Sequence, residues 1–184
     1  MRRLKTEVAK DLPPRTEVVL YNHLSQEERN IYNTLEAKTK QQILNNNDGS
    51  SVIKMLEALL RLRQAACNPG LLPGFTHTES SKVESLLSHL EQATSQNHKA
   101  LVFSQWTSLL DIIEKNLDRK NIKYLRIDGS TKNRQHIVET FQKDQQEHKV
   151  LLLSLKAAGI GLNLTAADHV FILDPWWNPA AEQQ

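Results

Sequence analysis

Residues 150–179 read VLLLSLKAAGIGLNLTAADHVFILDPWWNP and carry the clearest structural signal in the chain. Two apolar runs, at 150–153 and 169–173, flank a loop of small residues. Runs of this length, rich in Val, Ile, Leu and Phe, are typical of buried strands in a parallel sheet. The loop at 154–161 holds a hydroxyl, a cation, two alanines and two glycines, so its backbone N–H groups can approach a phosphate closely.

Helical and strand patterns alternate from residue 81 onward. This alternation predicts an α/β fold with a parallel sheet, right-handed crossovers and helices on both faces of the sheet. The expected helices span residues 82–94, 107–118 and 134–143. The expected strands span residues 100–104, 124–127, 150–153 and 170–173.

The first 80 residues follow a different pattern. Residues 16–24, TEVVLYNHL, alternate in polarity and predict a strand. Ser25 and Glu28 have capping-box spacing, which predicts the start of a helix. A polar break at 45–51 separates it from a second expected helix at 52–66, which has a wide apolar face. We therefore divide the chain into a connector (1–15), a strand with a helical protrusion (16–80) and a sheet lobe (81–184).

Composition narrows the function classes. The 184 residues suffice for one or two domains, and a formal net charge of +2 means that any basic surface is local. The single Cys67 cannot form an internal disulfide, and no Cys/His group has zinc-ligand spacing. None of the seven histidines lies in a motif typical of a base or a ligand, so we predict no metal site. No apolar stretch reaches the length of a membrane span.

Polar groups follow three of the expected strands at their carboxyl ends. These groups are Ser-Gln-Trp at 104–106, Asp-Gly-Ser-Thr at 128–131 and Ser-Leu-Lys-Ala-Ala-Gly at 154–159. Ligands of open parallel sheets bind at this edge, so the three loops should line one surface. Hydroxyls, small-residue N–H groups and helix N-termini hold phosphates without reading bases. The pattern therefore indicates a surface that follows a nucleic-acid backbone.

These segments resemble the Snf-type ATP-dependent DNA translocases of helicase superfamily two. KALVFSQW resembles motif IV, RIDGST resembles the motif after it, and SLKAAGIGLNLTAADHVFILDPWWNP resembles motif V and its extension. RRLKTEVAKDLPPRTE resembles the junction into the second motor lobe, and MLEALLRLRQAACNP a helix of that lobe. The motif sequences are closest to those of bacterial members of the family. Residues 67–81 contain no zinc-binding RING insertion, which a eukaryotic branch of the family carries near this position. The resemblance implies a second RecA-like lobe with an N-terminal helical protrusion.

The resemblance also implies roles for individual residues. The residues expected to face the DNA backbone are Ser104, Gln105, Gly129, Ser130, Ser154, Lys156 and Gly159. Gly161 and Asn163 would lie near the nucleotide, and Trp176, Trp177 and Asn178 would couple the two sites. Ala158 stands where glycine is more usual, and its methyl group restricts main-chain contact there.

ATP and Mg²⁺ are the implied cofactors, bound mainly by a first lobe. The chain contains no GxxxxGK[ST] phosphate loop and no Asp-Glu pair suited to a Walker-B site, and it stops before the arginine of motif VI. We therefore assign no catalytic residue and expect the chain to be inactive by itself. The implied partners are the first RecA-like lobe of the same polypeptide and double-stranded DNA. The resemblance also implies a monomeric protein. It would act at the nucleoid in the bacterial cytoplasm, or in the nucleus of a eukaryote.

Simpler interpretations stand beside these. Gly159 and Gly161 are compatible with a plain turn, Trp176 and Trp177 with packing, and Asp128 with a turn former. Lys156 suits a solvated loop, Arg61 and Arg63 a solvated helix face, and Cys67 a small buried residue. Two other functions stay open: a non-enzymatic interaction scaffold and the lobe of an RNA helicase. The DPWWNP sequence speaks against the RNA helicase, because it resembles the DNA translocases.

Overall fold

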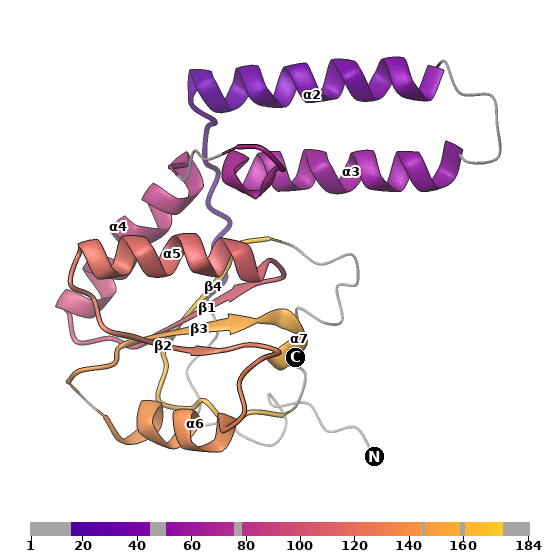
Figure 1. Ribbon diagram of the computed structural model, residues 1–184. Coiled ribbons are helices and arrows are strands. Elements are labelled where there is room, and N and C mark those ends of the chain that lie inside the picture. Colours follow the sequence, from indigo (N-terminus) through magenta and orange to yellow (C-terminus); the bar gives the residue numbers. More distant parts are fainter. Residues whose placement is uncertain (1–15, 45–50, 76–78, 145, 159–160, 175–184) are drawn as a thin grey trace.

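The protein is a four-stranded parallel sheet with helices on both faces and a pair of helices that extends away from it (Figure 1). The computed structural model describes residues 16–44, 51–75, 79–144, 146–158 and 161–174. The strands are β1 (Ala100–Ser104), β2 (Tyr124–Ile127), β3 (Val150–Ser154) and β4 (His169–Ile172), in the order β2-β3-β1-β4. The predicted α/β class and the four predicted strands are confirmed.

Each face of the sheet has its own apolar core. Side chains alternate along a strand, so Val102 and Leu152 face one side while Leu101 and Leu151 face the other. The first core is covered by α4 (Ser81–Ser95) and α5 (Thr107–Arg119). The second is covered by α6 (Arg134–Lys143) and the short α7 (Leu155–Ala158). β3 is buried along its whole length, as its unbroken apolar sequence predicts.

The N-terminal part contains α2 (Gln26–Leu44), α3 (Ser51–Cys67) and a short 3-10 turn, η1 (Pro69–Leu71). α2 and α3 lie alongside each other at one end of the molecule (Figure 1). The capping box is confirmed: the Ser25 N–H donates to Glu28 Oε2 at 2.7 Å, and the Glu28 N–H donates to Ser25 Oγ at 3.2 Å. Across the described ranges, no helix combines the length and the apolar character needed to cross a membrane.

The strand predicted at residues 16–24 is wrong. This segment adopts no regular secondary structure, and Val18, Val19 and Tyr21 are 69%, 67% and 88% exposed. A strand needs a hydrogen-bonding neighbour and a surface to cover, and alternating polarity in a sequence specifies neither. The sheet pairs β2, β3, β1 and β4 with one another and does not include this segment.

Buried polar contacts join the helix pair to the lobe. Glu28 is 3% exposed and accepts hydrogen bonds from the backbone N–H of Ser81 at 3.2 Å and from its hydroxyl at 2.5 Å. Beside this contact, Asn68 Nδ2 donates to Ser80 Oγ at 3.1 Å. Ser80 and Ser81 begin α4, so these bonds fix the start of the lobe against both N-terminal helices.

Cys67 lies at the same joint and is 6% exposed, as expected of a small buried residue. Burial raises the pKa of its thiol. The Lys82 ammonium donates to the carbonyl of Leu173 at 3.1 Å, which ties α4 to the segment that follows β4.

Candidate functional site at the carboxyl edge of the sheet

The three polar loops lie at one edge of the sheet. Ser104, the last residue of β1, is the register partner of Ser154, the last residue of β3. Ile127, at the end of β2, pairs with Leu153, which places Asp128 next to Ser154 along the edge. Because all three strands are parallel, their carboxyl ends share this edge, as the sequence predicts. Gly159 lies outside the described residues.

The first loop is organised by Ser104. Its side chain is fully buried, and its Oγ accepts the Trp106 N–H at 3.0 Å. This bond shapes the turn that leads from β1 into α5. Gln105 is half-buried, and its backbone N–H donates to Asp174 Oδ2 at 2.9 Å. The Ser104 hydroxyl is therefore part of the turn rather than of the surface.

Asp174 is a residue of this site that the sequence reasoning missed. It is 1% exposed and follows β4 at the same edge. Burial raises the pKa of its carboxyl, while hydrogen bonds from Gln105 and Ser104 act in the opposite direction. Among the described residues, Asp174 Oδ1, Gln105 Nε2 and Trp106 Nε1 are buried without a hydrogen-bond partner. Asp174 directly follows the apolar run of β4, and this position at the carboxyl end of a strand could have identified it from the sequence.

The second loop is held by Asp128. Its Oδ1 accepts the backbone N–H of Ser130 at 2.8 Å and the Ser130 hydroxyl at 2.6 Å, and its own N–H donates to Thr131 Oγ1 at 2.9 Å. The bond from Ser130 and the neighbouring Arg126 hold the pKa of the Asp128 carboxyl below its ordinary value. Asp128 is therefore a turn former. Gly129 and Ser130 are exposed at the tip of this turn.

Arg126 supports this turn from β2, a role that no motif in the sequence indicates. Its Nε donates to Asp128 Oδ2 at 2.8 Å. Its NH1 lies 2.6 Å from Asp111 Oδ1 and 2.8 Å from Glu114 Oε2, both on α5. One guanidinium thus connects the second loop to the helix that follows the first loop. A charge-assisted network of this kind restricts the orientation of the loop.

The third loop presents a cation. Ser154 is 4% exposed, whereas Lys156, two residues later in α7, is exposed. Among the three loops, Lys156 therefore offers a positive charge on the surface beside the buried ends of β1 and β3. An exposed lysine attracts an anion as a point charge.

The segment after α7 contains the two residues expected near a nucleotide. Gly161 has φ +63°, a conformation that favours glycine, and open space surrounds the position of a Cβ there. Asn163 is exposed, and its carbonyl accepts Gln142 Nε2 at 2.8 Å. Gln142 Oε1 also accepts the Ala166 N–H at 2.8 Å. Gln142 therefore fixes this loop against α6, and the space around Gly161 is open. Trp176, Trp177 and Asn178 lie outside the described residues.

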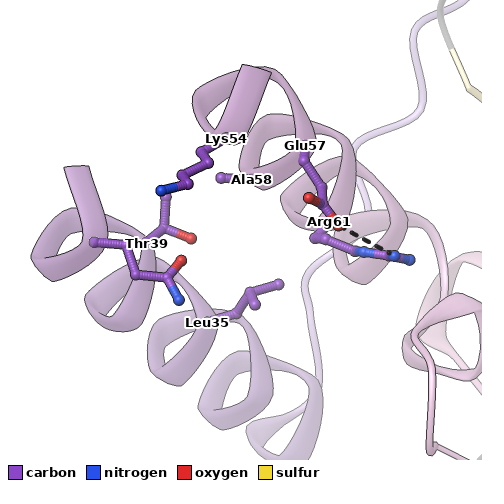
Figure 2. Close-up of a pocket in the computed structure, with 7 residues that line it drawn as sticks. Leu35, Thr39, Lys54, Glu57, Ala58 and Arg61 are labelled. Atoms are coloured by element: carbon purple, nitrogen blue, oxygen red, sulfur yellow. Dashed lines mark ion pairs between the residues drawn. The ribbon is translucent and has the colours of Figure 1, made fainter. Parts of the chain in front are cut away.

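A separate hollow lies between α2 and α3 (Figure 2). It has a volume of about 390 Å³, and its lining includes Leu35, Thr39, Lys54 and Arg61. Arg61 forms an ion pair with Glu57, with 3.6 Å between NH2 and Oε1. The hollow lies on the helix pair, away from the carboxyl edge, so it does not belong to the candidate site.

Known protein families match both parts of the chain. The family described as helicase conserved C-terminal domain matches residues 81–184, and the SNF2-related domain matches residues 1–71. The chain belongs to the helicase C-terminal domains of the SNF2 family. The SNF2-family assignment agrees with the Snf-type motifs of the sequence and with the RecA-like parallel sheet.

Curated relatives of this SNF2-family chain are much longer proteins. It is 36% identical to the probable chromatin-remodeling complex ATPase chain of Oryza sativa, with all of this chain and 18% of that protein covered. It is 50% identical to the DNA repair protein RAD5B of Arabidopsis thaliana over 110 residues, which is 58% of this chain and 8% of that protein. The chain thus spans less than a fifth of either relative.

Solved structures show the same fold. The SWI2/SNF2 ATPase core of Sulfolobus solfataricus, solved in complex with double-stranded DNA, matches with a TM-score of 0.81 and 28% identity. That match covers 97% of this chain and 39% of the archaeal one. The C-terminal domain of the same archaeal ATPase matches with a TM-score of 0.76 and 29% identity, covering 88% of this chain and 72% of that one. These relatives are eukaryotic or archaeal. They therefore do not support the expectation that the chain is most similar to bacterial members of the family.

Proposed function

We propose that this chain is the second motor lobe of a DNA-dependent ATPase that translocates on double-stranded DNA. The observation that carries the proposal is the register of the sheet, which brings the loops after β1, β2 and β3 to one edge. A relative that is similar over 97% of this chain was solved with double-stranded DNA, which supports duplex DNA as the ligand. Contacts of this kind neutralise phosphates and carry no base specificity.

The exposed groups of this edge are the ones that we assign to the DNA backbone. Lys156 supplies the charge, and Gln105, Gly129 and Ser130 supply polar groups beside it. The Ser130 hydroxyl must leave Asp128 Oδ1 in order to donate to a phosphate. Ser104 and Ser154, expected to contact DNA directly, are buried, and Ser104 shapes its loop by accepting the Trp106 N–H. We also assign Gly159 to the DNA backbone, on the basis of the family resemblance alone.

ATP and Mg²⁺ complete the proposal. Gly161 and Asn163 would form one wall of an ATP site between two lobes, and a first lobe would supply the phosphate loop and the Mg²⁺ ligands. Bound ATP would draw the two lobes together, and the phosphoryl transfer that it undergoes would loosen them again. We assign Trp176, Trp177 and Asn178 to the coupling of this cleft with DNA on the family resemblance.

The first lobe is the proposed partner within the same polypeptide. The SNF2-related domain match covers residues 1–71, which include the exposed apolar residues Val18, Val19 and Tyr21. Burial of such side chains against another domain is favourable, so this segment suits an interface with that lobe. We accordingly propose a connector at 1–15, a protrusion at 16–80 and the lobe proper at 81–184. Such a motor works at the genome, in the nucleus of a eukaryote or at the nucleoid of a bacterium.

ATP hydrolysis by a polypeptide that joins this chain to its first lobe tests the proposal. We expect duplex DNA to stimulate phosphate release and single-stranded or duplex RNA to stimulate it much less. Stimulation by RNA alone would favour an RNA helicase. Hydrolysis and DNA affinity that are both absent in the folded two-lobe protein would favour an interaction scaffold.

A further inference from the structure

Two imidazoles and a carboxylate meet at the opposite edge of the sheet, where the strands begin. His98 lies two residues before β1, and Asp168 and His169 lie at the start of β4. One ligand atom from each of the three residues lies within 4.8 Å of the others. The sequence predicted no metal site, because His98 and Asp168 lie 70 positions apart in the chain. We propose that His98, Asp168 and His169 form a binding site for a divalent transition-metal ion, with Zn²⁺ as the best-suited ion.

The ligand set fits such an ion. Imidazole nitrogen and carboxylate oxygen are preferred donors for Zn²⁺, and the residual positions of the ion remain open to water or to a partner. Asp168 Oδ1 lies 2.9 Å from His169 Nδ1, and Asp168 Oδ2 contacts His98 Nδ1. Two ligand atoms on a tetrahedral zinc are roughly 3.3 Å apart, given metal–ligand distances of about 2.0–2.1 Å. Small rotations of these half-exposed side chains bring the three donors to that spacing.

The backbone beneath the cluster is fixed. The N–H groups of Asp168 and His169 both donate to the carbonyl of Lys99, at 3.2 and 3.1 Å. His169 is in register with Ala100, which directly follows Lys99. On the other side, the His98 N–H donates to the Ala93 carbonyl at 2.9 Å. The three ligands therefore sit on adjoining, paired segments, which lowers the entropic cost of bringing them around an ion.

The rings are also held by their neighbours. The centroids of the His98 and His169 rings are 4.9 Å apart, with the rings tilted by 57°. His169 stacks on Phe171, with 6.5 Å between centroids and 18° between planes. In the tautomer that carries its proton on Nε2, each imidazole offers an Nδ1 lone pair toward the carboxylate. A bound ion would replace the hydrogen bonds that now join Nδ1 to Asp168.

A second group of potential ligands, Asp144, Glu147 and His148, differs in kind. Its Asp144 carboxylate accepts the backbone N–H groups of Gln146, Glu147 and His148, at 3.0, 2.9 and 3.1 Å. These oxygens hold a turn after α6, and binding an ion would unmake it. This group therefore serves as the internal control.

An ion at the proposed site would hold β4, a strand at the edge of the sheet, against the segment before β1.

Titration of the full 184-residue chain with Zn²⁺ alone, after removal of trace metal with a chelator, tests the site. Isothermal calorimetry should show one saturable site. His98→Ala and His169→Ala should each weaken Zn²⁺ binding at least about tenfold, since loss of even an outer-shell partner has an effect of that size. His148→Ala, in the second group, and His136→Ala, exposed on α6, should leave binding unchanged.

A measurement on the unmodified chain removes any dependence on how the variants fold. In NMR spectra, the ring nitrogens of His98 and His169 should shift together on addition of Zn²⁺. Bound Co²⁺ should show stronger visible d–d bands than the six-coordinate aqueous ion. Absence of saturable Zn²⁺ binding would overturn the proposal. So would shifts at His148 with none at His98 and His169, or equal affinity in all four variants.

Discussion

Replacement of Glu28 by alanine should uncouple the helix pair from the lobe. The carboxylate is buried and accepts three hydrogen bonds, from the Ser25 N–H, the Ser81 N–H and the Ser81 hydroxyl. Hydrogen bonds to a charged group contribute about 1.5–3 kcal/mol each, and their loss is not additive. We therefore expect Glu28→Ala to lower the free energy of unfolding by about 3 kcal/mol. Glu28→Gln, which keeps one carbonyl acceptor, should cost less.

Urea unfolding followed by circular dichroism measures this change. Glu27→Ala is the matched control, since Glu27 is an exposed glutamate in the same first turn of α2, and it should change stability by no more than about 0.5 kcal/mol. A cost for Glu28→Ala no larger than that of its control would refute the role given to these bonds.

The same variant has a defined dependence on pH. Burial alone would raise the pKa of Glu28, but the hydrogen bonds from Ser81 and Ser25 outweigh it, so the pKa lies below its ordinary value of 4.5. The folded state therefore favours the charged form. The difference in stability between the native chain and Glu28→Ala should be complete above pH 4.5 and should shrink as the pH falls through the lowered pKa. A difference that grows on acidification would contradict this assignment.

Three further outcomes follow from the contacts. Arg126→Met should lower the free energy of unfolding by about 2 kcal/mol in urea titrations, because it leaves three carboxylates near one another without their cation; a change below about 0.5 kcal/mol would count against the network. Cys67 should react with iodoacetamide roughly tenfold or more slowly in the native chain than in urea, because it is buried and its thiol pKa is raised; equal rates would contradict its burial. Gln142→Ala should speed hydrogen exchange at the Ala166 amide, which loses its acceptor, and an unchanged exchange rate would show that another group holds the loop.

The lobe could be predicted from its sequence because local and long-range signals agree there. The unbroken apolar run at 150–153 requires burial on both faces, and a parallel sheet with helices on both sides provides it. The register that places Ser104 beside Ser154 then follows from strands of similar length that begin at one edge. The α6 boundaries match because Asn133 caps the helix, with Oδ1 accepting the His136 N–H at 3.3 Å.

The failures share one physical cause, which is that sequence patterns do not identify partners. Residues 16–24 alternate like a strand, yet no neighbouring strand of this sheet pairs with them. The apolar face of α3 was identified, but Ile53 and Leu56 on it are 74% and 57% exposed, so periodicity did not predict burial. The roles of Arg126 and Asp174 depend on residues distant in the chain, such as Asp111 and Gln105.

The serines show a further limit. A hydroxyl after a strand suggests a phosphate contact, but Ser104 and Ser154 are buried by the same register that brings them together. Whether such a residue serves its own turn or a ligand depends on the local hydrogen bonds, which sequence spacing does not specify. The exposed Lys156 is the residue of this edge on which the proposed grip depends most directly.

The salt dependence of duplex DNA binding by Lys156→Ala tests this central claim. Fluorescence anisotropy between about 50 and 200 mM salt should show that the slope of log affinity against log salt becomes shallower by about 0.9 in this variant, the value for one lost phosphate contact. Lys123→Ala, an exposed lysine just before β2 at the opposite edge, should keep the native slope. An unchanged slope in Lys156→Ala, or an equal loss in Lys123→Ala, would contradict a DNA grip at the carboxyl edge.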